Sequence, residues 1–281
     1  GKTLTNSNTA VLTVSGGVTG TGNLVLNNNS TTAAGILLST TTVNNVGTVT
    51  NSGAGTGGST ISAVIGTNVT GVVENSATSQ LTLSGVNTFT NNGTTTFGLS
   101  VKSGTVSGTT SASAFGAGAI TLGNTSGTAN ATLNGGFVGT FANAINVVAG
   151  SSGTLKITNS AASIFSGAVT LNNDLTLAPT LTNLLTLSGG ITGTGNLIVS
   201  GTGTTAAVTL STNPVNNIGT ITNQGSNTGT TTISGGVGAN VTGITENSTS
   251  SALTVSGALT VGASGKTLTN SNTAVLTVSG G

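Results

Sequence analysis

Residues 265–281 of this chain repeat residues 1–17 without a single change. The offset in residue number is 265 − 1 = 264, so we interpret residues 1–264 as one period of a tandem array and residues 265–281 as the start of the next period, continuous with the first. Repeat proteins stack each unit on its neighbours and grow in length. This exact sequence repeat therefore predicts an elongated fibre or stalk and disfavours a compact enzyme.

A second, diverged repeat lies inside the first. Residues 18–26 match residues 191–199 at six of nine positions, and the other three positions exchange one aliphatic residue for another. Residues 43–51 match residues 215–223 at an offset of 215 − 43 = 172, again with aliphatic exchanges only. The first pair has an offset of 191 − 18 = 173, one residue more than the second. A turn can accommodate a difference of one residue without disturbing the strands.

We therefore expect two half-copies at about residues 2–86 and 175–257, separated by a distinct middle segment at about residues 87–174. The middle segment holds every phenylalanine of the chain. We expect these rings to fill the core where the cross-section widens, and an exposed aromatic strip for a sugar or a partner is the alternative. They are Phe89, Phe97, Phe115, Phe137, Phe141 and Phe165.

Charged residues make up 2% of the chain, aromatic residues make up 2%, and histidine and cysteine are absent. Binding to nucleic acid requires basic side chains that neutralise phosphates, and binding to single strands adds aromatic platforms. No apolar run approaches the roughly 18 residues that suggest a membrane span. We expect neither a nucleic-acid partner nor a membrane-spanning segment here.

The composition also separates packed β-structure from disorder. Disordered chains combine low hydrophobicity with high net charge and abundant proline. This chain is 35% hydrophobic, carries a net charge of +1 and has two prolines. A thick globular core is disfavoured as well, because such cores rely on aromatic side chains. A thin all-β structure fits this composition best.

Short β-prone runs recur along the chain, and clusters of glycine, asparagine and serine separate them. Most runs place a threonine between two aliphatic residues, which is the period-2 pattern of a half-buried strand. Glycine and asparagine tolerate positive φ and form tight corners. No segment has the spacing and caps of an amphipathic helix. The runs are 12–14, 24–26, 81–83, 120–122, 185–187 and 253–255, and the corners include 16–17, 27–29, 91–93, 135–136 and 189–190.

Together these features predict an all-β parallel β-helix, or β-solenoid. Each coil of about 20–25 residues closes three sides and lies on the previous coil at the ~4.8 Å strand spacing, which places about a dozen coils in one period. Inward aliphatic side chains form a thin continuous core, and each large one gains roughly 1.5–3 kcal/mol on burial. Asparagine and threonine at the corners are expected to form hydrogen-bonded ladders between coils.

Residues 81–96 (LTLSGVNTFTNNGTTT) resemble the autotransporter-associated β-strand repeat of bacterial surface proteins, which typically reads LTLSGANTYTGGTT. The motifs at residues 103–106 and 113–123 follow in the order of that family, and residues 131–135 close the unit. Phe89 stands where the family usually has tyrosine. The resemblance implies a right-handed parallel β-helix that is exported to the bacterial cell surface and acts as an adhesin or stalk.

Residues that carry catalysis or bind metals are scarce, since the only acids are Glu74, Asp174 and Glu246. Glycoside hydrolysis needs paired carboxylates, calcium turns need many acidic ligands, and a serine nucleophile needs an activating base. We therefore expect no enzymatic activity, no catalytic residue, no cofactor and no metal site.

Glu74 and Glu246 occupy equivalent positions in the two half-copies. We expect each to be a solvated corner that contributes little to stability. The alternative is an acid that caps a turn or meets a lysine of a neighbouring fibre. Triplets of the Asn-x-Ser/Thr type, such as those at Asn68 and Asn130, leave glycosylation open.

The functional prediction is a structural shaft of an extracellular fibre or adhesin stalk at the bacterial cell surface. Its partners are further repeats stacked end to end, with lateral bundling and another cell surface or matrix left open. One alternative is a shaft that itself binds glycans, other cells or ice, through threonine pairs such as those in 3–5, 48–50 and 220–222, although these pairs are irregularly placed. Another is a self-assembling filament of cross-β type, because low charge and strong β propensity favour association of strand edges.

Overall fold

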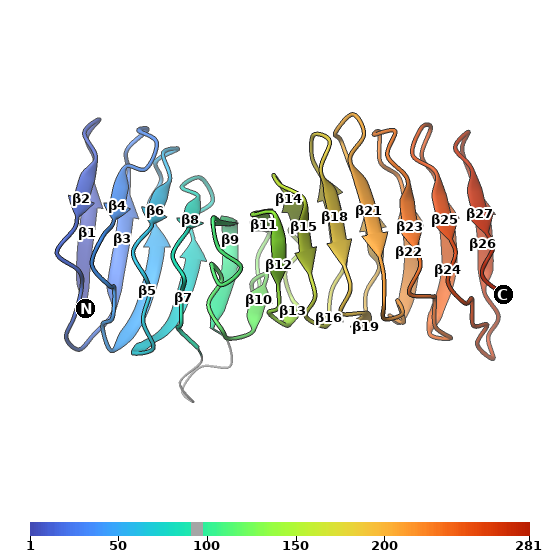
Figure 1. Ribbon diagram of the computed structural model, residues 1–281, viewed down its shortest axis with the longest axis horizontal. Helices are drawn as coiled ribbons and strands as arrows, with labels where there is room; N and C mark the ends of the chain where they lie inside the picture. Colours follow the sequence, from blue (N-terminus) through green and yellow to red (C-terminus); the bar gives the residue numbers. More distant parts are fainter. Residues whose placement is uncertain (91–97) are drawn as a thin grey trace. The chain divides into compact units, whose positions relative to one another are not determined.

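The computed structural model describes residues 1–90 and 98–281, and these residues form strands β1 to β27 without a helix (Figure 1). The strands pair in parallel and stack as a β-solenoid of about 12 turns, which confirms the predicted fold class. The handedness of the coil stays a prediction. Contacts divide the chain into two units, Gly1–Phe137 with Ser151–Gly153 and Val138–Gly150 with Thr154–Gly281. The half-copy boundaries drawn from the sequence stay predictions too.

In the first unit, two parallel sheets form two sides of the coil. One sheet contains β1 (Lys2–Asn6), β3 (Leu24–Asn28), β5 (Gly47–Ser52), β7 (Val69–Asn75), the first part of β9 (Leu99–Thr109) and β10 (Ile120–Leu122). The other contains β2 (Leu12–Val14), β4 (Ile36–Leu38), β6 (Ser59–Ile61), β8 (Leu81–Leu83), the second part of β9 and β11 (Ala131–Gly136). Isolated parallel bridges that join Val18 to Val43 and Val43 to Ile65 mark the third side.

In the second unit, all three sides carry strands. The first side is β12 (Gly139–Phe141), β15 (Ser163–Phe165), β18 (Leu184–Leu187), β21 (Ala207–Leu210), β23 (Thr231–Ile233), β25 (Leu253–Val255) and β27 (Leu276–Val278). The second side is β13 (Ile145–Val147), β16 (Val169–Leu171) and β19 (Ile191–Gly193), continued by bridges through Val215, Val237 and Leu259. The third side is β14 (Leu155–Asn159), β17 (Leu175–Pro179), β20 (Leu197–Val199), β22 (Gly219–Asn223), β24 (Val241–Glu246) and β26 (Thr267–Asn270).

Strand register gives the length of each coil as the difference between two paired residue numbers. That difference is 176 − 156 = 20 for Lys156 and Thr176, and 99 − 72 = 27 for Val72 and Leu99. The coil length predicted from the sequence is therefore correct for most turns and slightly short for the widest. Because the register is parallel, like side chains stack in columns, with buried aliphatic residues inside and half-exposed threonines outside.

The predicted strands are all present, but two of the predicted corners need correction. Asn27 and Asn28 lie inside β3, so the chain leaves that strand only at Asn29. Gly17 and Gly190 each have φ of +81°, a conformation that favours glycine, which confirms these two corners. Gly135 and Gly136 lie inside β11 and form no corner. Gly135 pairs with Gly108 on β9, and a Cβ at Gly108 would lie 2.6 Å from Cζ of Phe115. Glycine at that position therefore makes room for an aromatic ring. The corner expected at residues 91–93 lies outside the described residues.

The phenylalanines confirm the expectation of local core filling. Phe89, Phe115, Phe141 and Phe165 have no exposed surface. Phe141 pairs in register with Phe165, and their ring centroids are 5.3 Å apart with the ring planes tilted by 30°. Phe137 is half-buried, and the expectation for residue 97 falls outside the described residues.

The half-copies recur as matching strands. β3 returns as β20 at an offset of 197 − 24 = 173, and β5 returns as β22 at an offset of 219 − 47 = 172. Even the irregularities match, because the register shifts after Gly47 and again after Gly219, where φ is +156° and +154°. The internal repeat in the sequence is therefore also a repeat of local structure.

Candidate functional site

The most elaborate polar site in the first unit is a buried corner at the end of β7. Glu74 lies there next to Asn51 of β5, in register, and neither side chain has exposed surface. Asn51 Nδ2 donates to Glu74 Oε2 and to the backbone carbonyl of Ser79, both at 2.7 Å. The backbone N–H of Ser76 donates to Glu74 Oε1 at 2.7 Å. The carboxyl group therefore bridges one strand to the next and caps the turn that follows it.

The second unit builds the same corner at the end of β24. Asn223 Nδ2 donates to Glu246 Oε2 at 2.8 Å and to the carbonyl of Ser251 at 2.6 Å. The backbone N–H of Ser248 donates to Glu246 Oε1 at 2.6 Å. Both Asn223 and Glu246 are fully buried. The matching positions of the two acids in the half-copies thus correspond to one hydrogen-bonded arrangement made twice.

The prediction that Glu74 and Glu246 are solvated corners is wrong. Each acid stands two residues after an inward aliphatic residue, Val72 or Ile244, so the period-2 alternation of the strand carries it into the core. That parity was readable in the sequence, but a charged residue beside a turn suggested exposure. The alternative that the acid caps a turn agrees with the bonds from Ser76 and Ser248.

Burial governs the ionisation of these acids. It raises the pKa of Glu74 to about 9, against the lowering effect of the hydrogen bonds from Ser76 and Asn51. Burial likewise raises the pKa of Glu246. A carboxyl group held in a dry core has a large desolvation cost when it is charged, so the neutral acid is favoured. Burial therefore favours the neutral form of Glu74, while its two oxygens accept the hydrogen bonds that join β5, β7 and the following turn.

Asparagine side chains reinforce the other corners by single bonds to backbone carbonyls of neighbouring coils, whereas the sequence predicted continuous ladders of side chains. Asn28 Nδ2 donates to the carbonyl of Gly58 at 3.0 Å, and Asn159 Nδ2 donates to the carbonyl of Leu184 at 2.9 Å. Asn45 and Asn217 make the same kind of bond on another corner, to the carbonyls of Gly22 and Gly195 respectively. These bonds satisfy corner carbonyls that the parallel ladder leaves unpaired.

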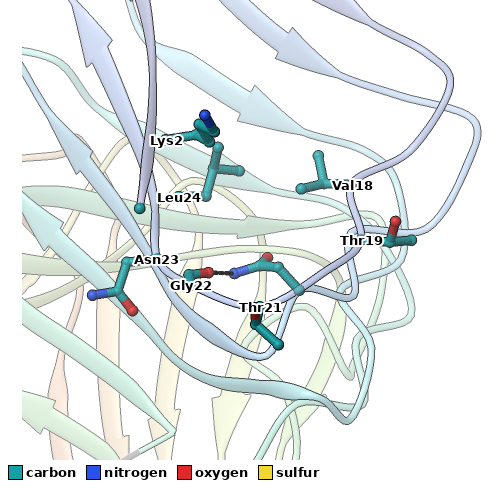
Figure 2. A pocket seen from close by; sticks show the side chains of 9 residues that line it. Lys2, Val18, Thr19, Thr21, Gly22, Asn23 and Leu24 are labelled. Carbon is teal, nitrogen blue, oxygen red and sulfur yellow. Dashed lines mark hydrogen bonds between the residues drawn. The ribbon is translucent and has the colours of Figure 1, made fainter.

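Among the described residues, the first unit carries a small pocket and a broader hollow. A pocket of about 90 Å³ opens beside the starts of β1 and β3, and Figure 2 shows Lys2, Val18 and Leu24 around it. A shallow hollow of about 460 Å³ lies over β6 and β8 and is lined by uncharged residues only. Its lining is Thr31, Ala33, Ala34, Thr56, Gly57, Gly58, Thr60, Gln80 and Thr82.

Threonine and serine form two parallel columns on one side of the second unit, a feature that the sequence reasoning missed. The middle threonines of five successive strands pair in register, and each is followed two residues later by a serine whose N–H continues the ladder. The sequence pattern that could have predicted these columns is a T-x-S triplet that recurs once in every coil from β18 to β27. The columns are Thr186, Thr209, Thr232, Thr254 and Thr277, and Ser188, Ser211, Ser234, Ser256 and Ser279.

The threonine pairs predicted from the sequence do not form such columns in the first unit. Thr3 of β1 pairs with Val25, and Val25 pairs with Thr50 of β5, so an aliphatic residue interrupts the hydroxyl groups. In the second unit, Thr222 pairs with Thr245, and Thr245 with Thr269. The pairs are thus placed irregularly, as the sequence indicated.

Metal-binding groups do not gather in the described part of the chain, where no three His, Cys, Asp or Glu side chains lie together. Residues 1–90 and 98–281 also contain no helix long and apolar enough to cross a membrane. Comparison with family models, with curated proteins and with solved structures found no match to this chain. What is shown is a β-solenoid of repeating turns, and the resemblance to autotransporter repeats stays a prediction.

Proposed function

We propose that this chain is a structural, non-catalytic segment of the shaft of an extracellular bacterial fibre or adhesin stalk, of the autotransporter-passenger type. One observation carries the proposal. The sequence shared by residues 1–17 and 265–281 stacks in parallel register at two places, on β3 and β4 near one end of the chain and on β24 and β25 near the other. A unit that ends as it begins is suited to be repeated along one axis.

The interior supports this role. Aliphatic columns provide stability coil by coil, so that length is gained without a larger core. The buried acid corners cross-link neighbouring coils by side-chain hydrogen bonds, and a fully bonded buried polar group specifies one register. Few charged groups are needed for either interaction, which is consistent with a charged fraction of 2%.

The proposal is tested with proteins that contain one, two and three periods of residues 1–264. Electron microscopy is expected to show rods of constant width whose length increases by an equal step for each added period. Particles that grow in all directions would refute the shaft. Surface location is tested separately, by treating intact cells of the native host with a protease and following loss of the protein.

A second candidate is a shaft that is itself adhesive, and the threonine and serine columns of β18 to β27 favour it. Regular hydroxyl groups on a flat sheet suit hydrogen bonding to glycans or to ordered water. Replacing Thr209, Thr232 and Thr254 together by valine keeps the shape of the side chains and removes three hydroxyls. The variant is expected to lose binding on a glycan array or in an ice-affinity assay, and unchanged binding would exclude this surface.

A further inference from the structure

The hollow over β6 and β8 is bounded by three successive coils of the first unit. The loop between β3 and β4 forms its rim, two glycines before β6 form its floor, and the residues at the start of β8 form its opposite side. These coils have neighbours on both sides, since Leu12 pairs with Ile36 and Leu81 pairs with Val106. Its volume of about 460 Å³ is within the range of about 300–1,000 Å³ that is typical of small-molecule sites.

The rim is a loop that is one residue longer than its counterpart in the second half-copy. Asn28 corresponds to Gly201 at an offset of 201 − 28 = 173, and Ile36 corresponds to Val208 at an offset of 208 − 36 = 172. The first loop therefore has 36 − 28 − 1 = 7 residues and the second has 208 − 201 − 1 = 6. In the longer loop Ala34 has φ of +51°, a strained conformation for a residue with a side chain, and it lines the hollow. The extra residue thus lies in the rim.

The floor is open because a glycine stands where the second half-copy has a side chain. Gly58 directly precedes Ser59 of β6, and Thr230 directly precedes Thr231 of β23 at the matching place. A Cβ at Gly58 would lie 2.9 Å from the backbone oxygen of Gln80. A threonine at this position would therefore occupy the floor after a small shift of the neighbouring coil.

The opposite side carries an amide that the second half-copy lacks. The backbone N–H of Ser59 donates to the Gln80 carbonyl at 2.8 Å. In the second half-copy the N–H of Thr231 donates to the Ala252 carbonyl at 2.8 Å, so Ala252 is the counterpart of Gln80. The exposed side chain of Gln80 donates from Nε2 to Thr82 Oγ1 at 3.2 Å. A side-chain amide has two donor hydrogens and an acceptor oxygen, so this bond leaves most of its capacity for a ligand.

Three threonine hydroxyls at the hollow are not used by the protein itself. Within residues 1–90 and 98–281, the hydroxyls of Thr31, Thr56 and Thr60 make no hydrogen bond. The counterpart of Thr56 in the second half-copy is Thr228, whose hydroxyl donates to the carbonyl of Thr204 at 2.5 Å. The second half-copy therefore uses within its own corner a hydroxyl that the first half-copy keeps at the edge of the hollow.

The chemistry of the lining selects a neutral ligand with many hydroxyl groups. None of the nine described residues that line the hollow is charged, so a charged ligand would lose hydration there without gaining an ion pair. Hydroxyl and amide groups both donate and accept hydrogen bonds, as sugar hydroxyls do. The methyl groups of Ala33 and Ala34 offer apolar contact to the C–H face of a sugar ring.

We propose that this hollow binds a short stretch of a neutral polysaccharide, held by the threonine hydroxyls and the Gln80 amide. The site is separate from the threonine and serine columns of β18 to β27. It rests on the proposed shaft only for its repetition: with about 12 turns in each period, hollows recur about 60 Å apart along the array. Weak contacts of one polysaccharide with successive hollows then add up. The hollow can fail as a sugar site while the shaft proposal stands.

Binding is measured on the isotope-labelled full chain with neutral dextran, mannan and galactan, and with polygalacturonate as an anionic comparator. At least one neutral polysaccharide is expected to shift the amide resonances of residues 31–34, 56–60 and 80–82 in a saturable way. Protein with three periods of residues 1–264 is expected to bind the same polysaccharide at least about tenfold more tightly than protein with one. Absence of saturable binding to all three neutral polysaccharides, or tighter binding of polygalacturonate, would overturn the proposal.

Two variants locate the site. Gly58→Thr fills the floor with the residue of the second half-copy, and Gln80→Ala removes an exposed amide without touching the core. Each is expected to weaken binding at least about tenfold, because hydrogen-bonding groups of the ligand lose their partners or their space. Gln224→Ala, which removes an exposed glutamine after β22, is the matched control and is expected to bind as the parent does. Unchanged binding in both hollow variants, or shifts on β18 to β27 instead, would refute this site.

Discussion

The two half-copies build the same buried acid corner, but the second half-copy adds hydrogen bonds to its asparagine. In the second half-copy, Thr231 Oγ1 donates to Asn223 Oδ1 at 3.1 Å. The first half-copy has Ser59 at the matching position, and there Asn51 Oδ1 and Ser59 Oγ are buried without a partner among the described residues. The comparison shows that the corner keeps the two contacts of the acid and tolerates the loss of a third bond.

The same comparison separates inward from outward positions. The outward residue of β4 is Leu37, whereas the outward residue of β21 at the matching position is Thr209. The inward columns of both strands stay aliphatic and the acid corner stays polar. An outward side chain contacts water and few neighbours, so exchanges there change stability little, whereas the corner has a defined set of partners.

The largest expected effect is a loss of stability as the pH rises from about 4.5 to about 9. The pKa of Glu74 is about 9 in the folded chain and about 4.5 when unfolded. The neutral acid therefore contributes its full stability below about pH 4.5, and this is lost as the pH rises towards 9, by a total of about 6 kcal/mol. Amide hydrogen exchange of β7 and β8 measures the loss when each observed rate is divided by the intrinsic exchange rate at the same pH, which gives the free energy of opening.

Glutamine at the acid positions sharpens this comparison between half-copies. Glu74→Gln is expected to remove the pH dependence of the opening free energy in β7 and β8 and to leave that of β24 and β25, and Glu246→Gln is expected to do the reverse. Glutamine has no proton to lose in this range, so the result does not depend on the baseline stability of either variant. A pH dependence that survives in both variants would contradict the assignment to these acids.

The next effect concerns the matched glycines at the register shifts. A Cβ at Gly47 would lie 2.6 Å from the Gly22 carbonyl oxygen, and one at Gly219 would lie 2.3 Å from the Gly195 oxygen, both at positive φ. Gly47→Ala and Gly219→Ala are each expected to destabilise the surrounding coils by about 3 kcal/mol. Amide hydrogen exchange at increasing urea concentration, analysed separately for each coil, measures the loss of stability. A neutral Gly243→Ala serves as control, since the nearest atom to a Cβ there is 3.6 Å away.

Removal of the asparagine amides tests the corner more finely. Asn51→Ala leaves Glu74 and the Ser79 carbonyl without their donor, at an expected cost of about 2 kcal/mol. Asn223→Ala loses the equivalent pair and also the bond from Thr231, so its cost is expected to be about 1 kcal/mol larger. The two losses of stability are compared through the denaturant concentration at which the coils around each corner are half unfolded. Equal losses would mean that the third bond contributes nothing.

The smallest effect comes from transplanting one residue between half-copies. Ser59→Thr installs the residue of the second half-copy, whose stiffer side chain is expected to direct its hydroxyl to Asn51 Oδ1. We expect a gain of about 0.5–1 kcal/mol in the first half-copy. Thr231→Ser is expected to cost a similar amount in the second, and thermal unfolding of the two variants checks the symmetry. A loss of stability in Ser59→Thr would show that the extra methyl group does not fit.

Much of the fold could be predicted from local sequence. The runs at 12–14, 81–83 and 253–255 became strands β2, β8 and β25 with unchanged bounds, because period-2 alternation and glycine corners are local properties. The burial of four phenylalanine rings followed from hydrophobicity alone. Gly135 and Gly136 were misread because a glycine pair is typical of a turn, and only their parallel pairing with Gly108 and Thr109 of β9 shows that they lie inside a strand.

The sequence by itself determined the strand-and-corner pattern, the coil length and the repetition of parts, since all three depend on spacing along the chain. Alternation along the strand gave Glu74 and Glu246 their parity, but the tertiary structure decided their full burial, because the asparagines that bond them lie on the neighbouring coil. It likewise decided which hydroxyl groups of β18 to β27 align, since parallel register sets residues that are one coil apart side by side. Burial and alignment are relations between coils.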